Sequence, residues 1–378
     1  MRLLWAHLLG FRNIAEARLD FCPGVNLLLG DNGHGKTNLL EALDYPSLGR
    51  SFRGAADGEL VRFGEPAAHL ELAAEDDDGR PMTFAAGIER DGRRRLRLDG
   101  ETVRRKADLV GRLLTVVYDP TTVELVRGGP RHRRRYLDRA LSLTSAEYLA
   151  QLRRYRRALR QKSHLLREGR RRRLPLAAVA RDLQAWNREL AASGRHLVRE
   201  RRRLAAETQP LATALHVALT GRRDELQLVY RQGFEVAAFS GAGGDFERDF
   251  DAVLDYIMTE EYQRGRCLAG PHLDDLDVRL AGVDLRTYGS QGETRTAAIA
   301  LQLAQGEFLW RHTGRRPVLM LDDIFSELDA DRARRLRELT AAEHQVFAAT
   351  ARREDVAGWV APALRAWRIR DGEVTPEP

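Results

Sequence analysis

A glycine-rich run near the N-terminus has the residue types that proteins use to hold a nucleotide phosphate. It fits G-x-x-x-x-G-K-[ST] in full and reads Gly30, Asp31, Asn32, Gly33, His34, Gly35, Lys36 and Thr37. An apolar run, 25–29, precedes it and a helical pattern follows from Asn38. Glycines let backbone N–H groups converge on a phosphate at a helix N-terminus. We therefore expect a site for ATP and Mg²⁺, in which Lys36 reaches the β- and γ-phosphates and the Thr37 hydroxyl binds Mg²⁺.

Lys36 is unusual in this chain. Of the 62 Lys and Arg residues, only Lys36, Lys106 and Lys162 are lysines. The excess of arginine extends along the whole chain and is explained by genome composition. A compact ammonium fits between phosphates where a planar guanidinium does not, so the lysine at this position favours a phosphate site over a bare strand-to-helix turn.

Two adjacent acids, Asp322 and Asp323, end the apolar run 317–321. In a doubly wound sheet the carboxyl ends of the strands face the ligand crevice. We expect Asp322 to hold Mg²⁺ through its water shell and Asp323 to orient and deprotonate the attacking water. Two acids can also simply cap a strand, but the phosphate loop favours the catalytic interpretation.

A second anion site is predicted at the start of the helical pattern 292–313. The residues there are Ser290, Gln291, Gly292 and Glu293. Ser290 and Glu293 have the spacing of a capping box, which any helix can carry. The run also resembles the signature motif of ABC-type ATPases, which binds the γ-phosphate of ATP held by the opposite subunit. The segment 325–329 resembles the D-loop of the same enzymes.

The elements that must position these residues form an α/β pattern interrupted by a helical insertion. We predict an ATPase head with a mixed sheet, made of residues 1–119 and 265–378, and a basic α-helical arm over residues 120–264. Strands are expected at 3–9, 17–21, 25–30, 69–74, 82–89, 96–98, 114–118, 277–280, 317–321, 346–349 and 366–369. Helices are expected at 131–168, 176–204, 246–264, 292–313 and 330–342, with a loop at 233–244.

Charge is concentrated in the predicted arm. Residues 127–203 contain 24 basic and 6 acidic residues, a net of +18, whereas the rest of the chain has 38 and 49, a net of −11. Arginines on a helix pair are often just a solvated face, but a field of this size favours an anionic partner. We expect sequence-independent contacts to DNA phosphates, double-stranded or at junctions. The candidates are Arg131, Arg133, Arg134, Arg154, Arg157, Arg171, Arg172 and Arg173.

Composition excludes several classes of protein. The chain is 43% hydrophobic and 31% charged, which is typical of a globular protein rather than a disordered one. Two distant cysteines exclude a disulfide framework. No apolar run approaches the roughly 20 residues that span a bilayer, and the first run has no cleavage site typical of a signal peptide. We expect a cytoplasmic protein.

The chain resembles the RecF family of bacterial recombination mediators over nearly its full length. The resemblance rests on 11–13, 21–26, 33–42, 50–53, 128–138, 270–275, 290–293 and 321–323. It implies an ABC-type, SMC-like ATPase that dimerises on DNA when it binds ATP and hydrolyses ATP slowly. It also implies cooperation with RecR and RecO to load RecA at gaps during DNA repair. It adds Arg12, Asn13 and Asn38 to the expected nucleotide site.

Three positions depart from the general ABC pattern and favour slow turnover. The first glutamine is Gln151, so the first part of the head has no Q-loop glutamine, and Asp119 is a candidate replacement. Thr350 stands where a switch histidine is usual, and a hydroxyl cannot accept a proton as imidazole does. Asp323 replaces the longer glutamate. Alternatives are an architectural SMC-like protein, disfavoured by the short arm, and a transporter subunit, disfavoured by the basic arm.

Overall fold

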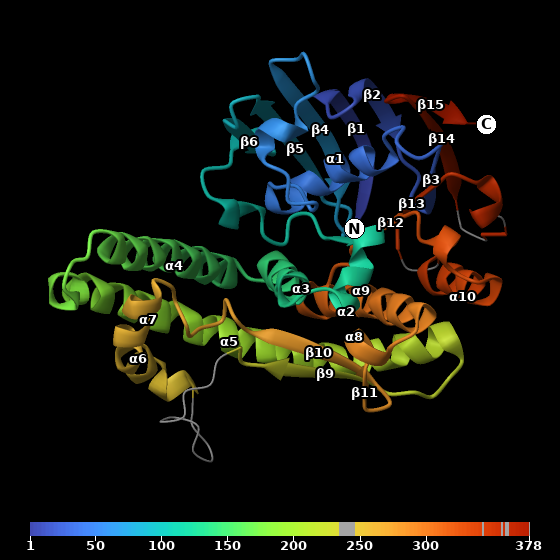
Figure 1. Cartoon of the computed structure of the whole chain (residues 1–378). Coiled ribbons are helices and arrows are strands. Elements are labelled where there is room, and N and C mark those ends of the chain that lie inside the picture. The colour runs from blue at the N-terminus through green and yellow to red at the C-terminus, as the bar shows by residue number, and fades with distance from the viewer. Residues whose placement is uncertain (234–245, 342–343, 357, 360–362, 378) are drawn as a thin grey trace. The chain divides into compact units, whose positions relative to one another are not determined.

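The computed structural model describes residues 1–233, 246–341, 344–356, 358–359 and 363–377. The chain divides into two compact units, which are described separately (Figure 1). The first unit contains Met1–Val123, Pro210–Glu225 and Gly289–Pro378, and the second contains Glu124–Gln209 and Leu226–Tyr288. Most of the predicted arm, 120–264, thus lies in the second unit, whereas 120–123 and 210–225 lie in the first. Residues 265–288, expected in the head, lie in the second.

The first unit contains two six-stranded sheets. The antiparallel one has the strand order β2 (Ile14–Asp20), β1 (Arg2–Phe11), β4 (Ala67–Glu75), β5 (Pro81–Glu89), β6 (Arg94–Leu98) and β7 (Glu101–Thr102). The mixed one has the order β15 (Glu373–Glu377), β14 (Leu364–Arg370), β3 (Val25–Leu29), β13 (Val346–Thr350), β12 (Val318–Asp322) and β8 (Thr115–Tyr118). In the mixed sheet β14, β3, β13, β12 and β8 are parallel, and β15 is antiparallel to β14.

The hydrophobic pattern explains both sheets. Strands β3, β12 and β13 are buried at every position, as expected of parallel strands that are covered on both faces. Helix α1 (Lys36–Leu48) packs against strands of both sheets, and its residues from Leu39 to Leu48 are all buried. Helix α9 (Gln291–Thr313) packs against β8. In contrast, β5 alternates between buried and accessible residues, as a strand covered on one face does.

Short elements and α10 complete the first unit. They are the 3₁₀ helices η1 (Asp57–Leu60), η2 (Lys106–Leu109), η3 (Pro120–Val123), η5 (Phe325–Glu327) and η6 (Arg353–Val356), and helix α10 (Ala330–Ala341).

The second unit is mainly helical. Its elements are α2 (Glu124–Arg127), α3 (Pro130–Thr144), α4 (Ala146–Arg171), α5 (Leu176–Thr220, whose last residues belong to the first unit), α6 (Phe246–Tyr256), α7 (Met258–Arg264) and α8 (Leu285–Tyr288). A small antiparallel sheet has the order β11 (Val283–Asp284), β10 (Asp275–Leu280) and β9 (Leu226–Arg231).

Two helices that were predicted as continuous are each divided in the structure, and some strands were not predicted. The single helix expected over 131–168 is broken at Ser145, whose extended backbone ends α3 and whose hydroxyl caps α4 by accepting a hydrogen bond from the Tyr148 N–H. The helix expected over 246–264 is interrupted at Ile257. Strands β9 and β15 were missed, and the loop predicted at 233–244 lies outside the described residues apart from Gly233. No helix in the described part of the chain is long and apolar enough to cross a membrane.

Candidate functional site

The phosphate loop joins β3 to α1, as its sequence requires. Gly35 precedes the helix with a φ of 116°, and an added Cβ there would lie 2.7 Å from the Asn13 side chain. Gly30 is required by close packing and not by its φ angle, because a Cβ on it would lie 2.1 Å from the carbonyl oxygen of Ile369 on β14. The two glycines therefore allow a loop that is packed against two neighbouring segments.

Lys36 is the first residue of α1 and its side chain folds back over the loop. Its Nζ donates to the carbonyl oxygens of Gly30 at 2.6 Å and Asp31 at 3.0 Å. Burial lowers the pKa of Lys36, while the charges of Asp323, Asp322 and Asp31 oppose that shift. The ammonium thus lies where the loop backbone and the acids meet.

Thr37 and Asp322 are brought into direct contact although they lie 285 positions apart. The Thr37 hydroxyl donates to Oδ2 of Asp322 at 2.6 Å. The pKa of Asp322 is raised to about 6, mainly by burial and to a lesser extent by the charges of Asp119 and Asp323, whereas the Thr37 hydrogen bond and the charge of Lys36 act against the rise. A hydroxyl and a carboxylate are oxygen donors of the kind that Mg²⁺ prefers.

These donors fit Mg²⁺ bound mostly by water and phosphate. In the described part of the chain, no three His, Cys, Asp or Glu side chains gather as a metal cage would require. Mg²⁺ in nucleotide sites keeps several waters and uses one or two protein oxygens. Thr37 and Asp322 supply that number.

Asp323 and Asp119 flank this contact. Asp323 has a φ of 53°, and its N–H donates to the Ala349 carbonyl at 2.9 Å, which fixes the turn at the end of β12. Its side chain is half-buried. Asp119 follows β8, whose Tyr118 pairs with Leu321 of β12, so the register places it beside the acidic pair. Its carboxylate already accepts bonds from the N–H and hydroxyl of Thr121.

Asn13 ties the β1–β2 turn to the phosphate loop. Its Nδ2 donates to the His34 carbonyl at 2.9 Å, and its Oδ1 accepts from Nδ2 of Asn38 at 2.8 Å. The loop is also held from the C-terminal hairpin, because the Asp371 N–H donates to Nδ1 of His34 and the Gly372 N–H donates to the His34 carbonyl. No sequence pattern indicated this hairpin contact.

Arg12 is engaged within the protein. Its Nε and Nη2 form a fork with the buried carboxylate of Glu41 at 2.9 and 3.0 Å, and its backbone has a φ of 54°. Ser51 donates to the same carboxylate, and Arg53 lies within 3.6 Å of it. Sequence reasoning missed Glu41 as the centre of this cluster, although all four residues lie in the segments that carry the family resemblance.

The Ser290 turn forms the predicted capping box. The Glu293 N–H donates to the Ser290 hydroxyl at 3.2 Å, and Oε2 of Glu293 accepts from the Ser290 N–H at 2.9 Å. The Arg332 guanidinium lies over Gly292, since a Cβ there would be 3.1 Å from it. Among the described residues, no hydrogen bond or ion pair connects 290–293 with the phosphate loop. The first turn of α9 therefore keeps N–H groups that α9 itself does not use.

Thr350 has partners of its own. Its hydroxyl donates to Oδ2 of Asp355 at 2.8 Å, and its carbonyl accepts from the Gly30 N–H at 3.3 Å. The side chain is fully buried. In this arrangement Thr350 positions the start of the phosphate loop through its backbone.

The predicted basic residues of the arm fall into three groups. Arg131, Arg157 and Arg173 are exposed and have no ion pair in the part of the chain that the structure describes. Arg154 pairs with Glu189, and Arg171 and Arg172 pair with Glu168, all at accessible positions. Exposed pairs of this kind are weak and exchange readily for phosphate.

Arg133 and Arg134 are placed differently from the expectation. Arg133 is buried, with its guanidinium paired to Asp275 at 2.6 Å and bonded to the Gly128 carbonyl. Arg134 is half-buried and donates to the Asp274 carbonyl at 2.6 Å, and its burial lowers its pKa. Arg133 is therefore withdrawn from the candidate DNA-binding residues, because its charge is neutralised inside the fold.

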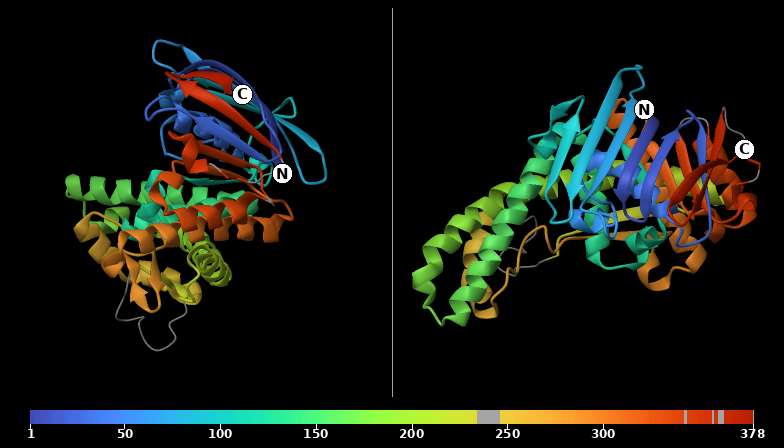
Figure 2. Two further views of the ribbon diagram at one scale, coloured as in Figure 1. Left: turned by 90° about the vertical axis from the view of Figure 1, so that its right-hand side faces the viewer. Right: turned by 90° about the horizontal axis from the view of Figure 1, so that it is seen from above.

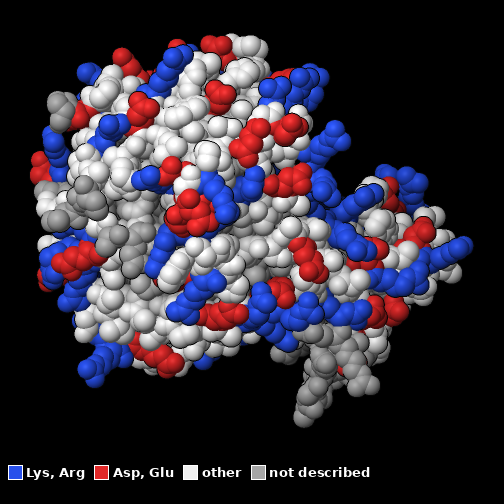
Figure 3. Space-filling view, turned by 180° about the vertical axis from the view of Figure 1, so that it is seen from behind, with Lys and Arg blue, Asp and Glu red and all other residues white. Residues whose placement is uncertain are grey.

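Helix α4 carries a basic stripe that the sequence reasoning did not separate from the surrounding arginines. Its members are exposed and recur at steps of three and four residues: Arg153, Arg157, Arg160, His164 and Arg167. Figure 3 shows the helical part of the molecule from behind, at the right, where blue Lys and Arg side chains are interspersed with red Asp and Glu side chains. The helical period was the signal that could have identified the stripe.

Comparison with known proteins agrees with this geometry. The family model described as RecF/RecN/SMC N terminal domain matches residues 5–362. Proteins described as DNA replication and repair protein RecF match from Heliobacterium modesticaldum, with 36% identity over 93% of this chain and 92% of theirs, and from Desulforudis audaxviator, with 36% identity over the full length of both.

Solved structures of RecF and of SMC heads are also similar to this chain. A structure described as the recombination mediator protein RecF with ATP in the RecFOR pathway has a TM-score of 0.87 and 28% identity, covering 100% of this chain and 97% of that one. An SMC head bound to a ScpA domain has a TM-score of 0.57 and 14% identity over 100% of this chain and 97% of that one, which shows a shared fold. The chain therefore belongs to the RecF family of DNA replication and repair proteins, with the ATP-binding, SMC-like ATPase fold of that family.

Proposed function

We propose that this protein binds ATP with Mg²⁺, hydrolyses it slowly, and uses the ATP-bound state to hold two copies together on DNA. The observation that carries the proposal is the 2.6 Å contact between Thr37 and Asp322 beside the ammonium of Lys36. It joins the phosphate loop to the strand-end acid at the position where a nucleotide-bound Mg²⁺ needs oxygen donors.

The roles follow from charge and geometry. Lys36 would exchange its bonds to the loop carbonyls for β- and γ-phosphate oxygens. Thr37 and Asp322 would hold Mg²⁺, which supplies positive charge to the transferred phosphoryl group. Asp323, half-buried beside them, would orient the attacking water and take its proton. An aspartate reaches less far than a glutamate, which supports slow turnover.

The Ser290 turn supports a site shared between two copies. The capping box satisfies the Glu293 N–H, while the N–H groups of Gln291 and Gly292 are in the first turn of α9, where a phosphate is favoured by the helix dipole. Because no hydrogen bond or ion pair joins this turn to its own phosphate loop among the described residues, it is available to the γ-phosphate held by a second copy.

Dimerisation is tested by measuring molecular mass with and without ATP. Ser290→Arg places a bulky cation at the turn and is expected to abolish the ATP-dependent dimer, while ATP binding by the monomer is retained. Thr375→Arg, at an exposed position on β15, is the control and should dimerise normally. Normal dimerisation of the Ser290 variant would rule out the shared site.

The DNA surface is proposed along the basic stripe of α4, joined by Arg131 and the Arg171–Arg173 turn. The arginines of the stripe have no ion pair among the described residues, and guanidinium groups that recur along one helix face suit phosphate contacts without base readout. Arg157→Glu with Arg160→Glu should weaken binding to duplex DNA and reduce the slope of log affinity against log salt. Arg80→Glu with Arg104→Glu, at exposed positions in the first unit, is the matched control. Equal effects of both pairs would remove the stripe from the proposal.

Family membership supports the remaining part of the proposal. A solved relative is described as a recombination mediator of the RecFOR pathway. We infer that this protein acts in the cytoplasm with RecR and RecO to promote RecA loading at gaps or junctions in DNA. The test is RecA filament formation on gapped DNA with RecR and RecO, with and without this protein. No acceleration by the wild type would contradict this role.

A further inference from the structure

The outer face of the antiparallel sheet carries an ordered pattern of side chains. The register places Ala85 of β5 opposite Glu71 of β4 on one side and Arg97 of β6 on the other. Gly87 of β5 is likewise opposite His69 and Arg95. Seen from above, these strands face the viewer, and no helix covers them (Figure 2). Two rows of residues thus run across a sheet face that is open to solvent.

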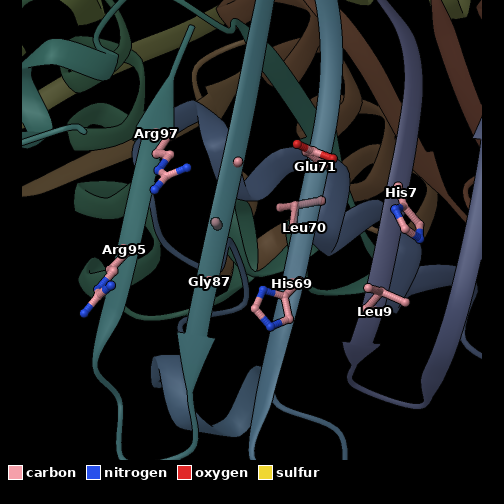
Figure 4. A pocket seen from close by; sticks show the side chains of 10 residues that line it. His7, Leu9, His69, Leu70, Glu71, Gly87, Arg95 and Arg97 are labelled. Carbon is pink, nitrogen blue, oxygen red and sulfur yellow. The ribbon is translucent and has the colours of Figure 1, made fainter. Parts of the chain in front are cut away.

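A groove lies over β5 on this face (Figure 4). Its volume is about 520 Å³, and its floor is formed by Ala85 and Gly87, the smallest side chains available. Arg95 and Arg97 of β6 line one side, and on the other side the lining continues over His69 and Glu71 of β4 to His7 and Leu9 of β1. The hollow is therefore a direct result of small residues on one strand between long ones on its neighbours.

The two arginines of the groove have no acidic partner in the part of the chain that the structure describes. Arg95 and Arg97 are exposed, and neither forms an ion pair or side-chain hydrogen bond among the described residues. The neighbouring arginines of the same hairpin behave differently, since Arg93 pairs with Asp91 and Arg94 pairs with Asp57. Unlike Arg93 and Arg94, the two arginines that face the groove thus have no acidic partner among the described residues.

We propose that this groove binds an extended, acidic polypeptide segment of a partner protein. Arg95 and Arg97 are two residues apart on one strand face, which separates their origins by about 7 Å. Carboxylates at alternate positions of an extended peptide have the same spacing, so a segment lying along β5 places two of them against the two guanidinium groups. The flat floor of Ala85 and Gly87 admits the peptide backbone.

Glu71 favours a peptide over a nucleic-acid strand. Its carboxylate is exposed on the opposite wall, where it repels a ligand that is negatively charged along its whole length. A peptide presents N–H donors on that side instead. The groove thus matches a ligand with carboxylates along one edge and donors along the other. It lies in the antiparallel sheet, apart from the phosphate loop, so the inference goes beyond the ATPase function.

The test uses a fluorescein-labelled decapeptide of alternating Asp and Val, with fluorescence anisotropy on the full chain. Arg95→Glu with Arg97→Glu is expected to weaken binding at least tenfold. Arg104→Glu, an exposed arginine outside the groove, is the matched control and should leave affinity unchanged. A peptide of alternating Lys and Val should not bind.

A second variant separates occupancy of the groove from charge. Gly87 has no positive φ, and an added Cβ would lie 3.7 Å from the His69 ring, an ordinary contact. Gly87→Val should therefore fold, because valine favours strands, and should block peptide binding by filling the floor. Undiminished binding by either groove variant would overturn the proposal. So would tighter binding of a ten-nucleotide oligothymidylate that is lost in the same variants, because the ligand would then be nucleic acid.

Discussion

Replacing Asp322 by asparagine should make the ligand-free protein more stable at pH 8. The carboxylate is 3% exposed, and burial raises its pKa to about 6. A raised pKa means that the folded state disfavours the ionised form. The cost of ionising Asp322 therefore does not destabilise the fold at a pH well below 3.8, the ordinary pKa of the group. This cost grows as the pH rises from 3.8 to about 6, and it reaches its full size above that interval. Asparagine has no such charge and can still accept the Thr37 hydrogen bond.

The size of the effect follows from the two pKa values. Their difference, at about 1.4 kcal/mol for each pKa unit, gives about 3 kcal/mol at pH 8. At pH 4.5 most folded molecules carry a protonated Asp322, and the same relation gives about 1 kcal/mol. The stability advantage of Asp322→Asn should therefore grow by about 2 kcal/mol between these pH values.

Urea unfolding followed by tryptophan fluorescence provides the assay. Four of the five tryptophans, Trp5, Trp310, Trp359 and Trp367, lie in the first unit, so the signal reports mainly on the unit that contains Asp322. Samples should contain EDTA and no nucleotide. Asp323→Asn removes the neighbouring carboxylate at a half-buried position and is the control. An advantage that is the same at pH 4.5 and pH 8 would refute the assigned burial cost.

Three further predictions concern the loop and the arm. Gly35→Ala should abolish ATP binding in equilibrium dialysis, because its φ of 116° is strained for alanine and the Cβ would press on Asn13; normal binding would contradict the loop geometry. Thr37→Val should retain ATP binding in EDTA but lose the gain in affinity from Mg²⁺, and an unchanged Mg²⁺ response would remove Thr37 from the metal site. Lys162→Met should cost about 3 kcal/mol in urea unfolding at pH 8, because it leaves the buried Glu261 carboxylate unpaired, and Lys162→Met with Glu261→Leu should recover most of that loss.

The sequence was sufficient for the parts of the site that are local. The phosphate loop is one contiguous motif between a strand and a helix, so its residues could be identified from that motif alone. Asp322 was found because parallel strands end at a common edge, so a strand-end acid can be assigned without coordinates. The capping box of Ser290 is equally local.

The missed parts depend on contacts between distant segments. The Glu41 cluster joins Arg12 from the β1–β2 turn with Ser51 beyond α1, and the His34 contacts come from the hairpin at Asp371. Nothing in a linear pattern indicates which turn will pack on which loop. Arg133 shows why a buried charge is equally difficult to predict. A basic run predicts a basic surface, but the position of each arginine around the helix axis decides which one faces inward toward an acid.

Helix α5 is a single helix whose residues are divided between the two units. Its 45 residues run without interruption from the second unit, up to Gln209, into the first, from Pro210. At 1.5 Å per residue the rod is about 68 Å long. Near its C-terminal end, burial lowers the pKa of His216. The charge of Arg332 on α10 lowers this pKa further, and the charge of Glu293 on α9 opposes the shift.

Pro210 has no N–H to donate to the preceding turn of α5, so the helix lacks one backbone hydrogen bond at this residue. Bending of α5 is therefore expected to cost least at Pro210.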